Sequence, residues 1–201
     1  LQAIPHNKLK YAKFFTAESV EVPGSCPDVK TVKNFDVKKF GNGIWYEVAR
    51  TPHIAEQGGQ CSYAEYVPYG DGFHVKNYHV EDGELKLIEG YAKGSKAGKM
   101  IHSLPYGKIN EIYLTVNGAI THNVLNVLAT DNDNYAILYH CNYNPAKKSH
   151  RNLLWVFSRS KDLSDEGVKA VENVYKTNKF LRQEEFVKVD FSEKACQISG
   201  T

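Results

Sequence analysis

Between Ile44 and Ser158 the chain repeats one local pattern, in which β-branched or aromatic residues alternate with polar ones over short stretches. Alternation with a period of two is typical of strands that bury one face and expose the other. The pattern predicts eight strands, at Ile44–Arg50, Cys61–Val67, Phe73–Val80, Glu84–Tyr91, Lys99–Leu104, Asn123–Thr130, Tyr135–Asn142 and Leu153–Ser158.

The joints between these strands are short and rich in turn formers, as in "PYGDGF", "VEDGEL", "KGSKAGK" and "TDNDNY". Gly, Asn and Asp supply the positive φ angles that hairpin turns need. Joints of this length exclude parallel crossovers, so the strands form an antiparallel meander. A meander of eight strands closes into a barrel with room for one small ligand. We therefore expect an all-β fold, an eight-stranded antiparallel up-and-down barrel.

The remaining segments complete this picture. Residues 1–25 are expected to form an extension, and residues 26–201 the barrel domain, a usual size for one domain. "LSDEGVKAVENVYKTNKFL" predicts one C-terminal helix packed outside the barrel, with Ser164 as N-cap and Val168, Val171, Val174 and Tyr175 on one face. "KINEIYLTVNGAIT", residues 108–121, is either an extra hairpin or a lengthening of two strands. "EFVKVDF" predicts a final short strand.

Composition and motifs exclude several function classes. Lys and Arg total 25 and Asp and Glu total 23, and they are scattered, so we expect no nucleic acid or membrane partner. No apolar run approaches the ~20 residues that span a bilayer, and a secreted form is expected to have lost its signal peptide. The eight histidines form no HxH or HExxH spacing, and no GxSxG motif occurs. We expect neither a metal site nor an enzyme.

Four cysteines, Cys26, Cys61, Cys141 and Cys196, are widely spaced and form no CxxC pair. An even number of distant cysteines predicts two disulfides and an oxidising compartment. The residues alone leave three pairings open, and four buried thiols in a cytosolic protein are the alternative.

Several motifs together resemble the lipocalin family. "GIWYE" near the first strand, "ATDNDNYAILYHC" at the seventh and "FSRS" after the eighth resemble the three lipocalin signature regions, in order and spacing. "CPDVK", "NFDVKKF", "VKNYHV", "NVLNVLATDN", "CNYNPAKKSH" and "DFSEKACQ" resemble the subgroup of insect bilin-binding proteins and insecticyanins. The resemblance runs from about Cys26 to Gln197. The leader and residues 108–121 depart from the subgroup.

This resemblance implies several structural features. Cys26 would pair with Cys141 and Cys61 with Cys196, which leaves no thiol for covalent attachment of a chromophore. "NFDVKKF" would form a short helical turn at the closed end. Trp45 would lie beneath the side chain of Arg159 as a cation–π pair worth ~1 to 2 kcal/mol, closing the base of the barrel.

Side chains two apart on a strand share a face, so alternation nominates the residues that point inward. Residues that the resemblance places on the pocket face, led by Asn77 and His79, make up the predicted ligand site. The site residues are Asn77, His79, Lys86, Ile88, His102, Leu104, Tyr106, Asn123, Leu125, Leu138, His140, Arg151, Leu153 and Trp155. Val75, Val127 and Phe157 also face inward, and Trp155 and Phe157 are alternatively simple core residues. A register error of one residue would turn His102, His140 or Arg151 outward.

A lining of this kind, apolar with a few polar groups, suits a large conjugated ligand with polar ends. The resemblance implies biliverdin, held without a covalent bond. With ~40 heavy atoms at ~0.3 kcal/mol each, contacts alone reach ~12 kcal/mol, near nanomolar affinity. Asn77 or His79 would meet the pyrrole and lactam groups, and Arg151 or lysines the carboxylates.

The function we predict is that of a secreted blue or green pigment carrier, extracellular in haemolymph or cuticle, for coloration or storage. One alternative keeps the container but changes the cargo to a carotenoid, retinoid, fatty acid or pheromone. Another is a structural protein whose barrel is filled by side chains. The residues leave the oligomeric state open, a homo-oligomer included.

Overall fold

The computed structural model describes residues 19–52, 58–95, 99–103, 114–116, 119–121, 123–183 and 186–199, and between residues 93 and 123 the description covers the backbone alone. The elements are β1 (Glu21–Pro23), α1 (Val37–Phe40), β2 (Gly43–Arg50), β3 (Gln60–Tyr69), β4 (Gly72–Glu81), β5 (Glu84–Ser95), β6 (Lys99–Ser103), β7 (Leu114–Val116), β8 (Ala119–Thr121), β9 (Asn123–Thr130), β10 (Tyr135–Asn144), β11 (Ser149–Ser158), α2 (Asp165–Thr177) and β12 (Val187–Lys188).

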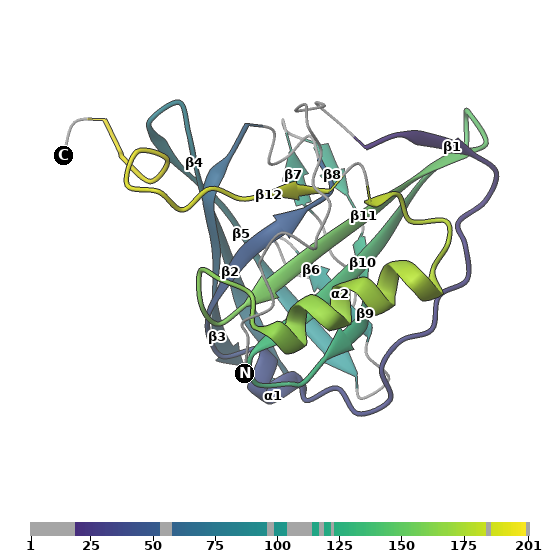
Figure 1. The fold of residues 1–201 in the computed structure, drawn as a ribbon, viewed down its shortest axis with the longest axis horizontal. Coiled ribbons are helices and arrows are strands. Elements are labelled where there is room, and N and C mark those ends of the chain that lie inside the picture. The colour runs from purple at the N-terminus through teal and green to yellow at the C-terminus, as the bar shows by residue number, and fades with distance from the viewer. Residues whose placement is uncertain are drawn as a thin grey trace.

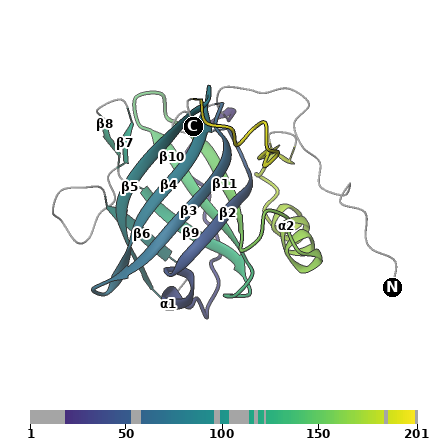
Figure 2. The same cartoon turned by 90° about the vertical axis from the view of Figure 1, so that its left-hand side faces the viewer.

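Eight of these strands form a closed antiparallel ring. Around the ring the order is β11, β10, β9, β6, β5, β4, β3 and β2, and the pairing of β11 with β2 closes it. Figure 2 shows the strands slanting around the barrel wall. The prediction of an eight-stranded up-and-down barrel is confirmed.

The eight predicted strands all occur, with small shifts at their ends. β11 begins four residues before the predicted Leu153, because its first residues pair with β1, which extends the wall beyond β2. Residues 108–121 contain a hairpin, since β7 and β8 pair with each other as a separate two-stranded sheet. "EFVKVDF" contributes only the two residues of β12, which pair with β2.

Helix α2 begins where the sequence predicts. The Ser164 Oγ accepts a hydrogen bond from the Gly167 N–H at 3.1 Å, as an N-cap does. Val171 and Val174 are buried in a cluster with Ile137 and Val156 from the outer faces of β10 and β11. The helix therefore packs outside the barrel, as Figure 1 shows.

Helix α1 lies at the closed end of the barrel (Figure 1), and aromatic side chains fill this end. Phe40 and Trp45 are fully buried and stack with ring centroids 5.1 Å apart, and the Trp45 Nε1 donates to the Phe40 carbonyl at 2.8 Å. The Arg159 guanidinium lies 3.8 Å from the Trp45 ring and donates to the Ile44 and Lys39 carbonyls, each at 2.8 Å. This confirms the predicted base plug.

The opposite end, which we call the mouth, holds the β4–β5 and β10–β11 turns. Cys26 bonds to Cys141 and Cys61 to Cys196, as the resemblance implied. The Cys61–Cys196 bond holds the C-terminal tail, whose Ser199 N–H donates to the Gly83 carbonyl in the β4–β5 turn at 2.8 Å. Neither helix in the described part of the chain is long and apolar enough to cross a membrane.

Candidate ligand-binding site

One part of the inner wall is formed by alternate residues of β4 and β5. Phe73 and Val75 of β4 are buried in the interior cluster, so Asn77 and His79, two and four residues beyond Val75, face the same side. The register pairs Asn77 with Ile88 and His79 with Lys86, and cross-strand partners share a face. The four predicted site residues on these strands therefore lie together on the inner wall, in the half toward the mouth.

Another part is formed by β9, β10 and β11. Leu125, Leu138 and Trp155 pack in or against the interior cluster, whereas Ile137 and Val156 pack under α2. These three residues therefore lie on the inner face of their strands, and Ile137 and Val156 lie on the outer face. The register pairs Leu138 with Trp155 and His140 with Leu153, so His140, Leu153 and Arg151 also occupy inward positions.

Among the predicted ligand contacts, Asn77 has a polar side chain that is available to bind a ligand. Its amide is half-buried, and no hydrogen bond reaches it from any residue in the described ranges. An amide carries two donors and one acceptor, and burying them without partners costs free energy. A polar group of a ligand at this height of the wall would satisfy them.

Two predicted histidines are buried on the inner wall. His79 is 5% exposed and His140 is 8% exposed. The His140 Nδ1 lies 3.1 Å from the Val124 carbonyl, which only accepts, so Nδ1 carries the proton and donates. This bond fixes the ring of His140 against β9 and gives it a structural role.

The two predicted cations, Lys86 and Arg151, lie near the mouth and already have anionic partners. The Lys86 Nζ forms an ion pair with Glu84, and Glu84 holds the pKa of Lys86 above its ordinary value by a hydrogen bond and by its charge. Arg151 donates to the Ser19 carbonyl and lies 3.6 Å from a carboxylate oxygen of Glu21.

Four predicted site residues lie where the structure gives less detail. Leu104 and Tyr106 fall outside the described residues. His102 and Asn123 belong to β6 and β9 and are paired with each other, and only their backbone is described. Their predicted roles stay predictions.

A buried ion pair on the inner wall was missed from the sequence. The Arg50 Nη1 donates to the Glu47 Oε1 at 2.7 Å, and Arg50 also donates to the Gly59 carbonyl at 2.7 Å and to the Ser62 Oγ at 3.4 Å. Arg50 is 2% exposed and pairs in register with Trp155. Glu47 is two residues from the inward Trp45, so strict alternation was sufficient to find it.

Arg50 escapes strict alternation because β2 contains a bulge. Across from β11, Ala49 pairs with Val156 and Glu47 with Phe157, so the extra residue is Val48. An extra residue shifts the alternation by one, which turns Arg50 instead of Ala49 inward. A charge pair buried this deeply is costly unless its hydrogen bonds are complete, and here the partners come from both β2 and β3.

Taken together, the inner wall is aromatic at the closed end, apolar above it apart from single polar groups and the Arg50–Glu47 ion pair, and charged at the mouth. Such a surface binds a ligand by burial of apolar area and fixes its orientation by a few hydrogen bonds. No cluster of side chains suited to a metal ion occurs in the described part of the chain.

Comparison with known proteins places this architecture. Residues 42–193 match the model of the lipocalin / cytosolic fatty-acid binding protein family. A bilin-binding protein of Pieris brassicae is 44% identical over 180 residues, which cover 88% of this chain and 89% of that protein. Insecticyanin-B of Manduca sexta is 38% identical over 192 residues, which cover 92% and 88%.

The solved structures agree. Insecticyanin from the tobacco hornworm Manduca sexta superposes with a TM-score of 0.75 at 36% identity, covering 90% of this chain and 94% of that one. The family match spans well over half of the chain. The chain belongs to the lipocalin / cytosolic fatty-acid binding protein family.

Proposed function

We propose that this lipocalin carries a linear tetrapyrrole, biliverdin, inside its barrel without a covalent bond. The observation that carries the proposal is the Asn77 amide, half-buried on the inner wall and uncommitted within the described residues, above the buried Phe73 and Val75. The similarity to a bilin-binding protein and to insecticyanins supports this cargo over others.

The chemical groups of a bilin match the inner wall, which changes from aromatic and apolar at the closed end to charged at the mouth. Its conjugated rings would lie against Trp155 and the apolar side chains of Ile88, Leu138 and Leu153. Its pyrrole N–H groups and lactam oxygens would meet Asn77, with His79 beside it. Its carboxylates would lie toward the mouth, near Lys86 and Arg151. The remaining predicted contacts are His102, Leu104, Tyr106, Asn123, Leu125 and His140.

The disulfides support non-covalent binding of the cargo. All four are in disulfides, so none is a thiol that attaches a chromophore. Disulfides form and persist in oxidising compartments. We therefore include secretion in the proposal, with the carrier acting extracellularly, in haemolymph or cuticle, in coloration or pigment storage, as a monomer or a homo-oligomer.

Optical titration tests the cargo. Biliverdin added to the purified protein should give paired violet and red absorption bands, and it should quench the fluorescence of Trp155 on the inner wall. Saturation should occur at one bilin per chain with a Kd near the nanomolar range. In the control, biliverdin is added in the same way to an unrelated disulfide-bonded protein with the same number of tryptophans.

Two other outcomes of these binding experiments would contradict the proposal. If biliverdin leaves the fluorescence unchanged while a carotenoid, retinoid or fatty acid quenches it, the barrel is a container for a different cargo. If organic extraction of the native protein yields no small molecule and none of these ligands binds, the carrier function is wrong.

A further inference from the structure

Three charged side chains meet at the mouth beside β1. The Lys147 Nζ lies 3.0 Å from the Glu21 Oε2, and the Arg151 Nη2 lies 3.6 Å from the same oxygen. The Ser149 hydroxyl donates to the other carboxylate oxygen of Glu21. We call Glu21, Lys147, Ser149 and Arg151 the rim cluster.

The rim cluster belongs to the inner wall. Glu21 pairs in register with Arg151, and cross-strand partners share a face. Arg151 in turn shares its face with Leu153 and Trp155 of the same strand. At ~3.3 Å per residue, Arg151 lies ~13 Å from Trp155 along β11, toward the mouth. A ligand whose apolar body lies against Trp155 would have its outer end near the rim cluster.

We propose that the rim cluster is a carboxylate subsite, in which Lys147 and Arg151 receive an acid group of the cargo and Glu21 occupies that place in the ligand-free protein. The proposal rests on the carrier function above, since a linear tetrapyrrole has an apolar ring system and two propionate arms. Glu21 then acts as an internal competitor that lowers the affinity for acidic cargo and leaves the affinity for neutral cargo unchanged.

The charges of the rim cluster fit this role. The hydrogen bond from Ser149, followed by that from Lys147, holds the pKa of Glu21 below its ordinary value, so Glu21 is a carboxylate at neutral pH. The Glu21 and Arg151 side chains keep exposed fractions of 26% and 28%. Solvent and ligand therefore reach both groups, and the pair is weak enough to exchange partners.

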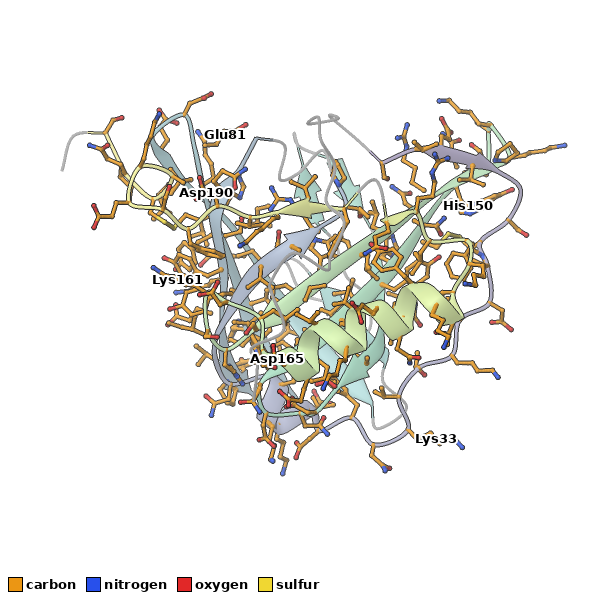
Figure 3. All side chains as sticks on the ribbon, viewed as in Figure 1. Lys33, Glu81, His150, Lys161, Asp165 and Asp190 are labelled. Carbon is orange, nitrogen blue, oxygen red and sulfur yellow. A yellow bond between two sulfur atoms is a disulfide. The ribbon has the colours of Figure 1, made fainter. Side chains whose placement is uncertain are left out.

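The backbone of β1 does not depend on Glu21. The Gly24 N–H donates to the Lys148 carbonyl at 2.9 Å, the His150 Nδ1 donates to the Gly24 carbonyl at 2.9 Å, and the Cys26–Cys141 bond follows directly. Figure 3 shows His150 beside β1 at the mouth, far from Lys33 near the closed end. The Glu21 side chain is therefore free to swing away while β1 stays in place.

The test compares two ligands on matched variants. Wild type, Glu21→Gln and Glu172→Gln are titrated with biliverdin and with biliverdin dimethyl ester, which keeps the chromophore and lacks the negative charges. Glu172 is exposed on α2, so its substitution makes the same change in net charge away from the mouth. We expect Glu21→Gln to lower the Kd for biliverdin about fivefold and to leave that for the ester unchanged. Glu172→Gln should change neither.

A second variant tests whether Arg151 receives the acid group of the ligand. Arg151→Gln should abolish the preference for the diacid over the ester, and thermal unfolding should confirm that each variant is folded. If Glu21→Gln changes the two Kd values by the same factor, or changes neither, the proposal is wrong although the carrier function stands. If wild type binds neither ligand, the carrier function itself is wrong, and the subsite falls with it.

Discussion

The two ends of the barrel are held together by different means. At the closed end Phe35, Phe40, Trp45, Tyr66 and Phe73 are each at most 2% exposed and pack as one aromatic cluster. At the mouth the described contacts include two disulfides, the pairing of β1, and ion pairs between partly exposed side chains.

This difference separates stability from binding. Dense packing stabilises the closed end and fixes it in one arrangement, because the side chains around a buried aromatic ring leave room for only one conformation. Partly exposed ion pairs contribute little free energy and exchange partners easily. The closed end is therefore held rigidly by packing, and the mouth is left to adapt to a ligand.

Trp45→Ala should have the largest effect. It removes a fully buried side chain, its bond to Phe40 and the ring beneath Arg159, and we expect a loss of about 3 to 5 kcal/mol in the free energy of unfolding. Urea unfolding measures the loss, and retention of biliverdin on a desalting column should fall with it. A variant that loses pigment at unchanged stability would contradict the assignment of Trp45 to the base plug.

Removal of the Cys61–Cys196 disulfide should come next. The bond closes a sequence separation of 135 residues, and loss of such a constraint costs about 2 to 5 kcal/mol. The double variant Cys61→Ser and Cys196→Ser leaves no unpaired thiol, and its thermal unfolding is compared with wild type. The tail that contacts Gly83 should also become sensitive to proteases. Equal protease resistance would mean that noncovalent contacts alone hold the tail.

Part of the closed end was predictable from local sequence, because Phe40 and Trp45 are close in the chain and the loop that begins at Asp131 is rich in Asp and Asn. The contact of Arg159 with Trp45 joins distant residues, and only the resemblance to lipocalins predicted it. Alternation likewise predicted the inner faces of β4, β10 and β11, because the side-chain period of a regular strand is two.

What could not be predicted depends on distant pairing or on an irregular backbone. The short β1 carries no signal of its own, and it exists because its backbone pairs with the first residues of β11, which are distant in the sequence. The bulge at Val48 leaves no clear mark in the sequence, yet it decides that Arg50 points inward to Glu47. Ligand contacts of Asn77 and the other site residues stay predictions.

Asp131→Asn should have a moderate effect that depends on pH. Burial raises the pKa of Asp131, but hydrogen bonds from Asn134, Tyr135 and Asp133 outweigh it, and the net pKa is lowered. A lowered pKa contributes stability above the ordinary value near 4, and that stability is lost as the pH falls through the folded value.

We therefore expect Asp131→Asn to lose about 1 kcal/mol at pH 7 and to show a flatter fall in stability below pH ~4 than wild type. Urea unfolding between pH 2.5 and 7 gives both quantities on one series of samples. Asp28→Asn, an exposed position, is the matched control and should follow wild type. If the stability of Asp131→Asn falls as steeply in acid as that of wild type, carboxyl groups other than Asp131 cause the loss of stability.

Asn77→Leu should change stability least and separates the two roles of the barrel most cleanly. The two side chains have similar shapes, and the Asn77 amide makes no hydrogen bond within the described residues, so the free energy of unfolding should change by less than about 0.5 kcal/mol. Loss of one ligand hydrogen bond should still raise the Kd for biliverdin about fivefold. Lys76→Ala, next to it on the outward side of β4, should change neither quantity, and fluorescence titration with urea unfolding measures both. If Asn77→Leu binds biliverdin as tightly as wild type, the amide does not contact the ligand, and the polar recognition must lie with His79 or at the mouth.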